Sequence, residues 1–366
     1  MTKNHYTLAV LPGDGIGIEV TQPCIELMQL ACERVGGIRL DMNSLPAGAT
    51  TYQETGDALP ETTLEQTRQA DAILLGAMGD PDVRYPDGTE ITPQIDLRFK
   101  LGLYAGIRPV RTIPGVPVPL SDKRAADIDF VLVRESIEGL FAPDAKGTLE
   151  GDEVATETLV ITRDVSTKLF NATFKLWQKR RAQNRGVNRV TCIDKANVFG
   201  AFAFFRKIFY EIAQDYSAPS DHAYVDAMAM NLITRPWDYD VMVTENMFGD
   251  ILSDQAAALV GGMGYAPSAD IGDHHAVFQP CHGTAPDIVG KGLANPTAMF
   301  LSGAMLLDWL GDKHTDEQAR SCAQLIERAV FKAFADGKLR TCELGGDSGL
   351  TDVSKAVQSA IKDLPL

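Results

Sequence analysis

The sequence predicts an α/β fold, because short apolar runs alternate with longer stretches of helical periodicity along the chain. The 366 residues, 45% of them hydrophobic, can bury a substantial core and are enough for about two domains. No internal repeat or low-complexity segment is visible. The chain is therefore expected to be globular, with strands and helices mixed along its length.

The apolar runs and the periodic stretches predict the elements in chain order. Buried strands are expected at 7–13, 71–79, 129–136, 189–195 and 240–246. Helices are expected at 17–35, 59–69, 165–181, 200–214, 248–260 and 295–310.

Two segments interrupt this alternation. The Pro-rich segment 108–120 is expected to be a connector, and the Gly-rich segment 261–272 interrupts the pattern again. They predict that the chain enters a second domain and later returns to the first. We therefore expect a discontinuous domain, 1–103 plus 263–366, and an inserted domain, 104–262.

Charge and cysteine content restrict the partners and the compartment. With 34 Lys and Arg against 49 Asp and Glu, the formal net charge is −15, so no long-range attraction draws the chain to nucleic acid or to an anionic membrane. No stretch approaches the roughly 20 apolar residues of a membrane helix, and no apolar signal segment precedes the first strand. The six cysteines are scattered without C-x-x-C spacing. We expect a soluble, cytoplasmic protein.

The first predicted strand leads into a glycine-rich turn, LPGDGIGIEV. The dinucleotide-binding fingerprint of Rossmann folds requires a third glycine where this chain has Ile18. A tight connection from strand to helix explains Gly13 and Gly15 without phosphate binding. The fold is therefore expected not to be a Rossmann fold.

Asp250 and Asp254 lie four residues apart in a predicted helix. At this spacing both carboxylates lie on one helix face, where like charges disfavour each other. They could lie near the helix N-terminus or face water. They could instead be paired oxygen ligands of a divalent cation. The spacing alone leaves both interpretations open.

Seven segments resemble, in order, those of the isocitrate and isopropylmalate dehydrogenase family: LPGDGIGIEV, DLRFKLGLYAGIRPVR, VLVRESIEG, CIDKANV, YVDAMAMNL, TENMFGDILSDQAA and HGTAPDIVGKGLANP. The resemblance spans most of the chain. It implies the family's two-domain α/β fold, with 1–103 plus 263–366 binding the cofactor and 104–262 serving dimerisation and metal and substrate binding. The implied reaction is a metal- and NAD(P)-dependent oxidation of a 2-hydroxy acid, usually with decarboxylation.

The resemblance also implies a metal site and a catalytic base. Asp250 and Asp254 of one subunit and Asp226 of the other would bind Mg²⁺ or Mn²⁺, because a hard cation offsets three carboxylates. Lys195, with Asp226 beside it from the same subunit, would take the proton of the substrate alcohol as hydride leaves. The implied assembly is a homodimer with shared active sites.

Substrate and cofactor residues follow from the same resemblance. Arg98, Arg108 and Arg134 would grip the carboxylates of a malate-type substrate. The loop along the adenosine half of the cofactor would consist of His282, Gly283, Thr284 and Ala285, and Asn295 would contact adenine.

Asp287 would accept hydrogen bonds from the ribose hydroxyls and repel a 2′-phosphate, so NAD is expected rather than NADP. The neighbouring His274 and His275 point in different directions along the chain and are expected to be surface residues.

Two positions depart from the family pattern. Phe141 stands where the family has a tyrosine that gives a proton to the enolate after decarboxylation, and phenylalanine has no proton to give. Gln279 stands where many relatives have a glutamate near the cofactor. The first departure places the completion of decarboxylation in question.

The substituent at C3 of the substrate would meet Ile91, Gln94 and Ile95, with Val198 of the partner nearby. An apolar lining favours an alkyl group, so 3-isopropylmalate or another 3-alkylmalate is the expected substrate. Because Gln94 is polar, tartrate or malate stays open, and isocitrate is a further alternative.

A non-catalytic, ligand-binding or regulatory subunit is an alternative of another class, motivated by the lost tyrosine hydroxyl. Retention of Lys195, the three aspartates and the three arginines argues for an enzyme, because an acidic cluster without a metal costs stability.

Overall fold

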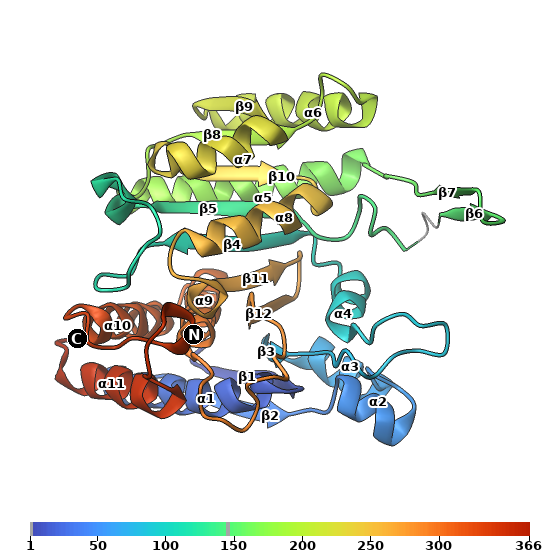
Figure 1. Ribbon diagram of the computed structural model, residues 1–366. Coiled ribbons are helices and arrows are strands. Elements are labelled where there is room, and N and C mark those ends of the chain that lie inside the picture. The colour runs from blue at the N-terminus through green and yellow to red at the C-terminus, as the bar shows by residue number, and fades with distance from the viewer. Residues whose placement is uncertain (1–2, 144–146) are drawn as a thin grey trace.

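The computed structural model describes residues 3–143 and 147–366. The main sheet is mixed and has ten strands, with helices on both faces (Figure 1). From one edge to the other its strands are β2 (Arg39–Ser44), β1 (His5–Gly13), β3 (Ala72–Ala77), β12 (Ala276–Pro280), β11 (Pro267–Ile271), β4 (Ala105–Arg111), β5 (Asp129–Glu135), β10 (Val241–Thr244), β8 (Val190–Asp194) and β9 (Ser220–Tyr224). The α/β prediction is confirmed, and this strand order is not that of a Rossmann fold.

The sheet consists of two parallel sets of strands that run in opposite directions. Strands β2, β1, β3 and β12 pair in parallel, as do β5, β10, β8 and β9. Strands β11 and β4 join the two sets through antiparallel pairing.

Helices gather around each half of the sheet (Figure 1). The half with β1 carries α1 (Ile16–Val35), α2 (Ala49–Thr55), α3 (Glu61–Gln69), α4 (Pro93–Leu101), α9 (Thr297–His314), α10 (Glu317–Phe334) and α11 (Leu350–Asp363). The half with β5 carries α5 (Arg163–Ala182), α6 (Gly200–Tyr216), α7 (Val225–Thr234) and α8 (Asn246–Ala258). Short 3-10 helices lie at Lys123–Asp127, Pro236–Asp238, Met263–Tyr265 and Cys342–Leu344. The predicted strands and helices are found with ends shifted by a few residues.

The interpretation of 108–120 as a connector is wrong for its first residues. Residues 108–111 belong to β4, in the middle of the sheet. Pro109 has no backbone N–H to donate, but β11 pairs with β4 only as far as Ile107, so the missing donor costs no ladder bond on that side.

Asp14 and two glycines fix the turn between β1 and α1. The Asp14 carboxylate accepts hydrogen bonds from the backbone N–H groups of Ala49, Thr50 and Gly79 at 2.7, 2.9 and 2.9 Å. Gly13 has φ 74°, and a Cβ there would lie 1.9 Å from the carbonyl oxygen of Ala77. The glycines therefore serve the tight connection expected from the sequence.

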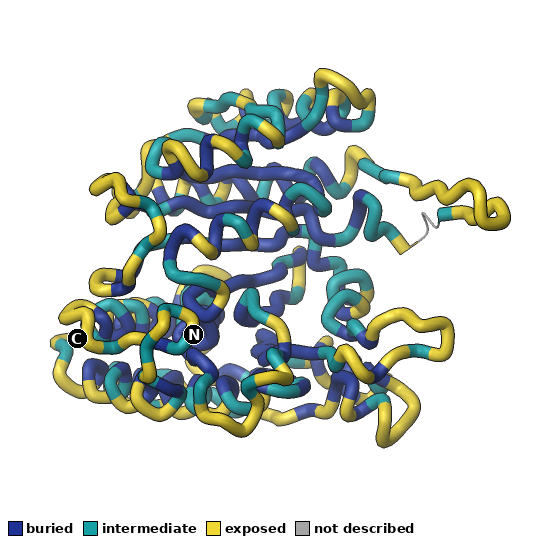
Figure 2. The backbone as a smooth tube through the Cα atoms, viewed as in Figure 1, coloured by how far each residue is buried: buried dark blue, intermediate teal, exposed yellow. Residues whose placement is uncertain are grey.

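One hydrophobic core extends through both halves of the molecule. It contains Leu8 and Phe300 from the half with β1, and Phe170 and Phe205 from the half with β5. The strands are buried and the outer faces of the helices are exposed (Figure 2). The sequence division into 1–103 plus 263–366 and 104–262 stays a prediction.

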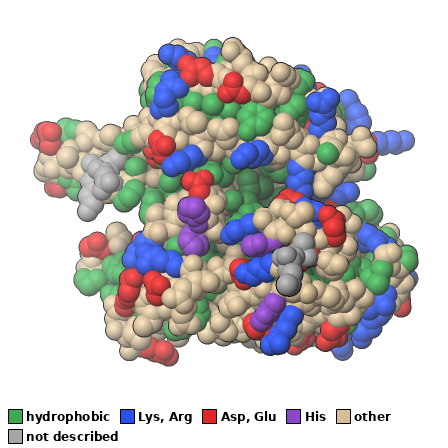
Figure 3. Space-filling model, turned by 180° about the vertical axis from the view of Figure 1, so that it is seen from behind, with side chains coloured by type: hydrophobic (Ala, Val, Ile, Leu, Met, Phe, Trp, Pro, Cys, Tyr) green, Lys and Arg blue, Asp and Glu red, His purple; other side chains and the backbone are tan. Residues whose placement is uncertain are grey.

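Two features lie outside this core. Strands β6 (Thr148–Glu150) and β7 (Val154–Thr156) form an exposed arm that stands away from the body (Figures 1 and 2), with Leu149 81% exposed. On the face seen from behind, a hollow of about 440 Å³ lies between the halves and is lined largely by hydrophobic side chains (Figure 3). In the described part of the chain, no helix has both the length and the apolar character needed to cross a bilayer.

Candidate active site

A polar pocket of about 180 Å³ opens near the middle of the sheet, between the two halves. Residues of α4, β4, β5, α8, β11 and β12 line it, together with the loop after β12. Seven of the predicted site residues lie in its wall: Arg98, Arg108, Arg134, Asp250, Asp254, His282 and Gly283. The pocket therefore brings together the predicted substrate arginines and two of the predicted metal ligands.

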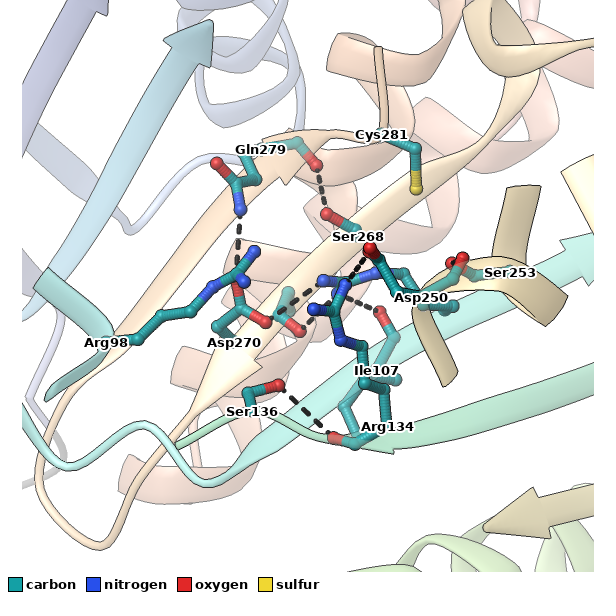
Figure 4. A network of polar contacts seen from close by, with 12 residues as sticks. Arg98, Ile107, Arg134, Ser136, Asp250, Ser253, Ser268, Asp270, Gln279 and Cys281 are labelled. Carbon is teal, nitrogen blue, oxygen red and sulfur yellow. Dashed lines mark hydrogen bonds and ion pairs between the residues drawn. The ribbon is translucent and has the colours of Figure 1, made fainter. Parts of the chain in front are cut away.

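Asp270 connects two of the arginines at the base of this pocket (Figure 4). Its carboxylate accepts from Arg98 Nε and from Arg108 Nη2, both at 3.1 Å. Gln279 Nε2 donates to the same carboxylate at 2.9 Å. The polar residue that replaces the family glutamate thus holds the group that orients the arginines.

Charge and burial act in opposite directions on Asp270, whose side chain is 1% exposed. Burial raises the pKa, but the charges of Arg98, Arg108 and Arg134 outweigh it and lower the pKa to about 2. Asp270 is therefore ionised at neutral pH.

The Arg134 side chain lines the pocket and packs against helix α8. Its Nε and Nη2 donate to Asn246 Oδ1 at 2.9 and 2.7 Å, and its Nη1 contacts Asp250. A Cβ at Gly249 would lie 2.6 Å from Arg134 Cγ, so only glycine leaves room for this side chain. Burial and then the charge of Arg98 lower the pKa of Arg134 to about 10, and the guanidinium stays charged at neutral pH.

Asp250 and Asp254 lie on α8, one turn apart, as predicted. Burial and then the charge of Asp250 raise the pKa of Asp254. A divalent cation would relieve this repulsion, and carboxylate oxygens are its preferred ligands. Within residues 3–143 and 147–366 no group of three or more acidic, His or Cys side chains converges as a metal site. Asp250 and Asp254 are thus the only two of the three predicted metal ligands that the described chain brings to this pocket.

Lys195 and Asp226 pair with each other and do not line the pocket. Lys195 follows β8, Asp226 begins α7, and Lys195 Nζ lies 2.5 Å from Asp226 Oδ1. The hydrogen bond from Lys195 lowers the pKa of Asp226. Large hydrophobic side chains are exposed on the segment before α6, on α7 and on α8: Val198, Phe199, Met230, Ile233 and Ile251. The structure thus separates the predicted base from the predicted substrate arginines.

The predicted cofactor loop is tied to the start of α1. Ile16 N donates to Thr284 O at 2.9 Å, and Gly290 N donates to Glu19 Oε1 at 2.7 Å. Ala285 has φ 40°, in the left-handed region. The β1–α1 turn thus supports this loop. At Gly15, with φ 55°, a Cβ would lie 2.3 Å from the carbonyl oxygen of Thr284, so the close approach requires glycine.

The remaining predicted cofactor residues differ in exposure. Asp287 is exposed and forms no ion pair within the described part of the chain. Asn295 is buried, and both ends of its amide are used internally: Nδ2 donates to Glu343 Oε1 at 2.6 Å, and Oδ1 accepts from Thr297 N at 3.1 Å. His274 is exposed and His275 is half-buried, in agreement with their prediction as surface residues.

The apolar lining expected around the C3 substituent is not found in the pocket wall. Ile91 is completely buried in a cluster with Ala49, Ala58 and Val83. Of the three residues expected from this chain, only Gln94 lines the pocket. The Phe141 ring lies 5.5 Å from the Arg134 guanidinium, which places it beside the predicted substrate arginines.

Sequence reasoning missed Asp270, Asn246 and Ser268. Asp270 lies in the Gly-rich segment 261–272, and it stands 172 residues from its partner Arg98 in the sequence. A buried acid in a short strand next to buried arginines is a signal that becomes visible only once the sheet order is known.

The fold is mixed α/β, and its central pocket gathers three arginines and two aspartates, an arrangement typical of an enzyme that acts on small acids. Residues 7–360 match the model of a family described as isocitrate/isopropylmalate dehydrogenase, and the chain belongs to that family. It is a decarboxylating hydroxy-acid dehydrogenase.

Two methanogen relatives are each 39% identical to the chain. One is the 3-isopropylmalate dehydrogenase of Methanothermobacter thermautotrophicus, with 97% of this chain and 98% of that protein covered. The other is the 3-isopropylmalate/3-methylmalate dehydrogenase of Methanocaldococcus jannaschii, with 98% and 99% covered. The crystal structure of isocitrate dehydrogenase from Methylococcus capsulatus aligns with a TM-score of 0.84 at 33% identity, covering 98% of this chain and all of that one.

Proposed function

We propose that the chain catalyses the NAD-dependent, Mg²⁺- or Mn²⁺-dependent oxidation and decarboxylation of a malate-type 2-hydroxy acid, in the cytoplasm, as a homodimer with shared active sites. The observation that carries this proposal is the pocket that joins three arginines to the aspartate pair of α8. Planar guanidinium groups grip carboxylates with paired hydrogen bonds, which orients a dicarboxylic substrate.

In this proposal Asp250 and Asp254 of one subunit and Asp226 of the other hold the metal. When bound, the metal would supply Lewis-acid polarisation of the substrate oxygen at C2, and the nicotinamide would supply the hydride acceptor. Lys195 of the second subunit would take the proton of the substrate hydroxyl. Because Phe141 has no proton to give, the enolate left by decarboxylation would take its proton from water or from another group.

The proposal of a dimer is supported by the position of the Lys195–Asp226 pair, which does not reach the arginine pocket of its own chain. The Lys195–Asp226 pair lies outside the pocket, and helices α7 and α8 expose hydrophobic side chains, among them Met230 and Ile251. A contact between two copies through α7 and α8 would bury these side chains and bring the pair of one copy to the pocket of the other.

NAD is proposed over NADP because of Asp287. Its carboxylate is exposed in the predicted cofactor loop, where it can accept from two ribose hydroxyls and would repel a 2′-phosphate.

The test mixes two inactive variants. Lys195→Met keeps the arginine pocket, and Arg134→Met keeps the lysine. In equal amounts, half of the re-formed dimers are mixed and each has one intact site of two, so about a quarter of the wild-type NADH production should return. CO₂ is measured alongside NADH, with NAD⁺ and NADP⁺ compared and EDTA added as a control. Absence of rescue would refute the shared site, and EDTA-insensitive turnover would refute the metal.

A further inference from the structure

We propose that the hollow between the two halves, on the face seen in Figure 3, binds a medium-chain aliphatic monocarboxylate, with the alkyl chain in the hollow and the carboxylate at Lys175. The hollow has a volume of about 440 Å³ and shares no lining residue with the arginine pocket. This second site goes beyond the proposed function and does not depend on it.

The hollow lies on the opposite face of the central strands from the arginine pocket. In β4, Arg108 lines the pocket, whereas Ile107 and Pro109 line the hollow. In β5, Arg134 lines the pocket and Val131 lines the hollow. Successive side chains of a strand point to opposite faces of a sheet. The same strands therefore present charged groups to the pocket and apolar groups to the hollow.

Helices α5 and α9 form the walls of the hollow and leave its floor open. Helix α9 packs on β11 and β12, and α5 packs on β5 and β10. The floor between them consists of apolar side chains of the sheet, such as Ala105 and Phe278. Half-buried Leu176 of α5 and Trp309 of α9 face each other across this floor. An open apolar space of this size, with few polar groups at its edge, is typical of a ligand site.

The charges around the hollow favour an anionic head group. Four cationic side chains line it: Lys175, Lys179, Arg180 and Arg185. Lys179 pairs with Asp308 and Asp312 of α9, both at 2.5 Å. Arg180 and Arg185 pair with Asp129. Lys175 is exposed and forms no ion pair within residues 3–143 and 147–366, so its single positive charge matches a head group with one negative charge.

The size of the hollow fits an alkyl chain of medium length. A cavity of about 150 Å³ holds the six carbon atoms of a benzene ring, so the hollow has room for a chain of about ten carbon atoms. Each methylene group that leaves water for an apolar wall adds to the affinity. A longer acid of the series should therefore bind more tightly until the hollow is full.

Isothermal titration calorimetry of the whole protein measures the binding of hexanoate, octanoate and decanoate. We expect one site per chain, with a Kd that falls about twofold to fourfold for each added methylene. Octanoate should bind more tightly than octanol, and octanol more tightly than octylammonium. Because Trp309 lines the hollow, its fluorescence should change over the same range of octanoate concentrations.

Two variants of α5 separate the head group from the chain. Lys175→Met should weaken octanoate binding by about twofold to fivefold and leave octanol unaffected, since an exposed ion pair contributes little. Lys168→Met, at an exposed lysine of the same helix that does not line the hollow, is the matched control.

Ala172→Phe fills part of the hollow and should weaken octanoate and octanol alike by about fivefold or more. Ala182→Phe, at the exposed end of α5, is its control, and circular dichroism checks that both variants fold.

The proposal is overturned if the affinity does not depend on chain length, or if folded Ala172→Phe binds octanoate as the wild type does. Equal affinity for the three head groups overturns the assignment of a carboxylate at Lys175. Displacement of octanoate by malate overturns the site, because the acid would then lie in the arginine pocket. None of these results bears on NADH formation, so the proposed function is tested separately.

Discussion

The arginine pocket and the Lys195–Asp226 pair are built in opposite ways. In the pocket, buried Arg108 and Arg134 find partners within the chain, through Asp270, Asn246 and neighbouring carbonyl groups. The pair lies at the surface, where the Asp226 side chain is 68% exposed. The arginines of the first region are held within one chain by long-range contacts, whereas the second region has only its own ion pair.

Because of this difference, substitutions in the two regions should affect stability and activity differently. A buried ion network contributes to stability chiefly because breaking it leaves charges without partners. An exposed pair contributes little, because water screens it. Residues of the pocket should therefore affect both folding and activity, and residues of the pair should affect activity alone.

The largest effect is expected from Lys195→Met, which would remove the proposed general base from the exposed region. We expect kcat to fall by about 10² to 10⁴, the range that general base catalysis supplies, with the urea midpoint unchanged. The control is Lys207→Met, at an exposed lysine of α6, which should leave kcat unaffected. Loss of stability in Lys195→Met would break the comparison between the two regions.

Next in size is Asp270→Ala, which removes the shared partner of Arg98 and Arg108. Two buried guanidinium groups would lose their counter-charge, so we expect the free energy of unfolding to fall by about 3–5 kcal/mol in urea titrations. Asp273→Ala, at an exposed position nearby, is the control. If the two variants are equally stable, the pocket is not held together by Asp270.

A smaller effect on the free energy of unfolding is expected from a change of pH, because Glu135 at the end of β5 has a shifted pKa. Burial raises its pKa to about 7, although its carboxylate accepts from the backbone N–H groups of Ile137 and Glu138. The native state therefore keeps a proton that the unfolded chain releases near pH 4.3. The stabilisation is complete below that pH and is lost as pH rises through about 7.

We expect the free energy of unfolding of the wild type, relative to Glu135→Gln, to fall by about 2 kcal/mol between pH 5 and pH 8. Urea titrations of both proteins across this range measure the difference. A constant difference would show that Glu135 ionises normally.

The smallest effect on stability is expected from Asp226→Asn. Because Asp226 is exposed and its pair with Lys195 is screened, the urea midpoint should not change measurably. Activity should nevertheless be lost, since the proposed metal would lack a ligand. A clear shift of the midpoint would mean that the pair supports the fold as well.

The sequence predicts much of the fold but only part of the pocket. Buried parallel strands such as β8 and β10 are continuous apolar runs, so local pattern is enough to find them. Strand β4 contains Arg108 and Pro109, which local rules assign to a connector. Its place in the sheet depends on pairing with β5 and β11, and this information is not local.

The same reasoning applies to the site residues. Arg98, Arg134, Asp250 and Asp254 stand in motifs that can be read along the chain, and the structure places them in one pocket. Asp270 gains its role only from partners that the fold brings to it. The spacing of Ile91 from Arg98 predicts a place at the pocket. In the structure the segment before α4 buries the Ile91 side chain in a separate hydrophobic cluster.

The hydrophobic core that extends through both halves has a consequence for how the protein melts. Phe170 and Phe205 belong to the same buried cluster as Leu8 and Phe300, so neither half can lose its packing without exposing apolar surface of the other. The halves are thus coupled in their thermodynamics, and heating should give one cooperative transition, in which the calorimetric and van't Hoff enthalpies agree for each folded unit.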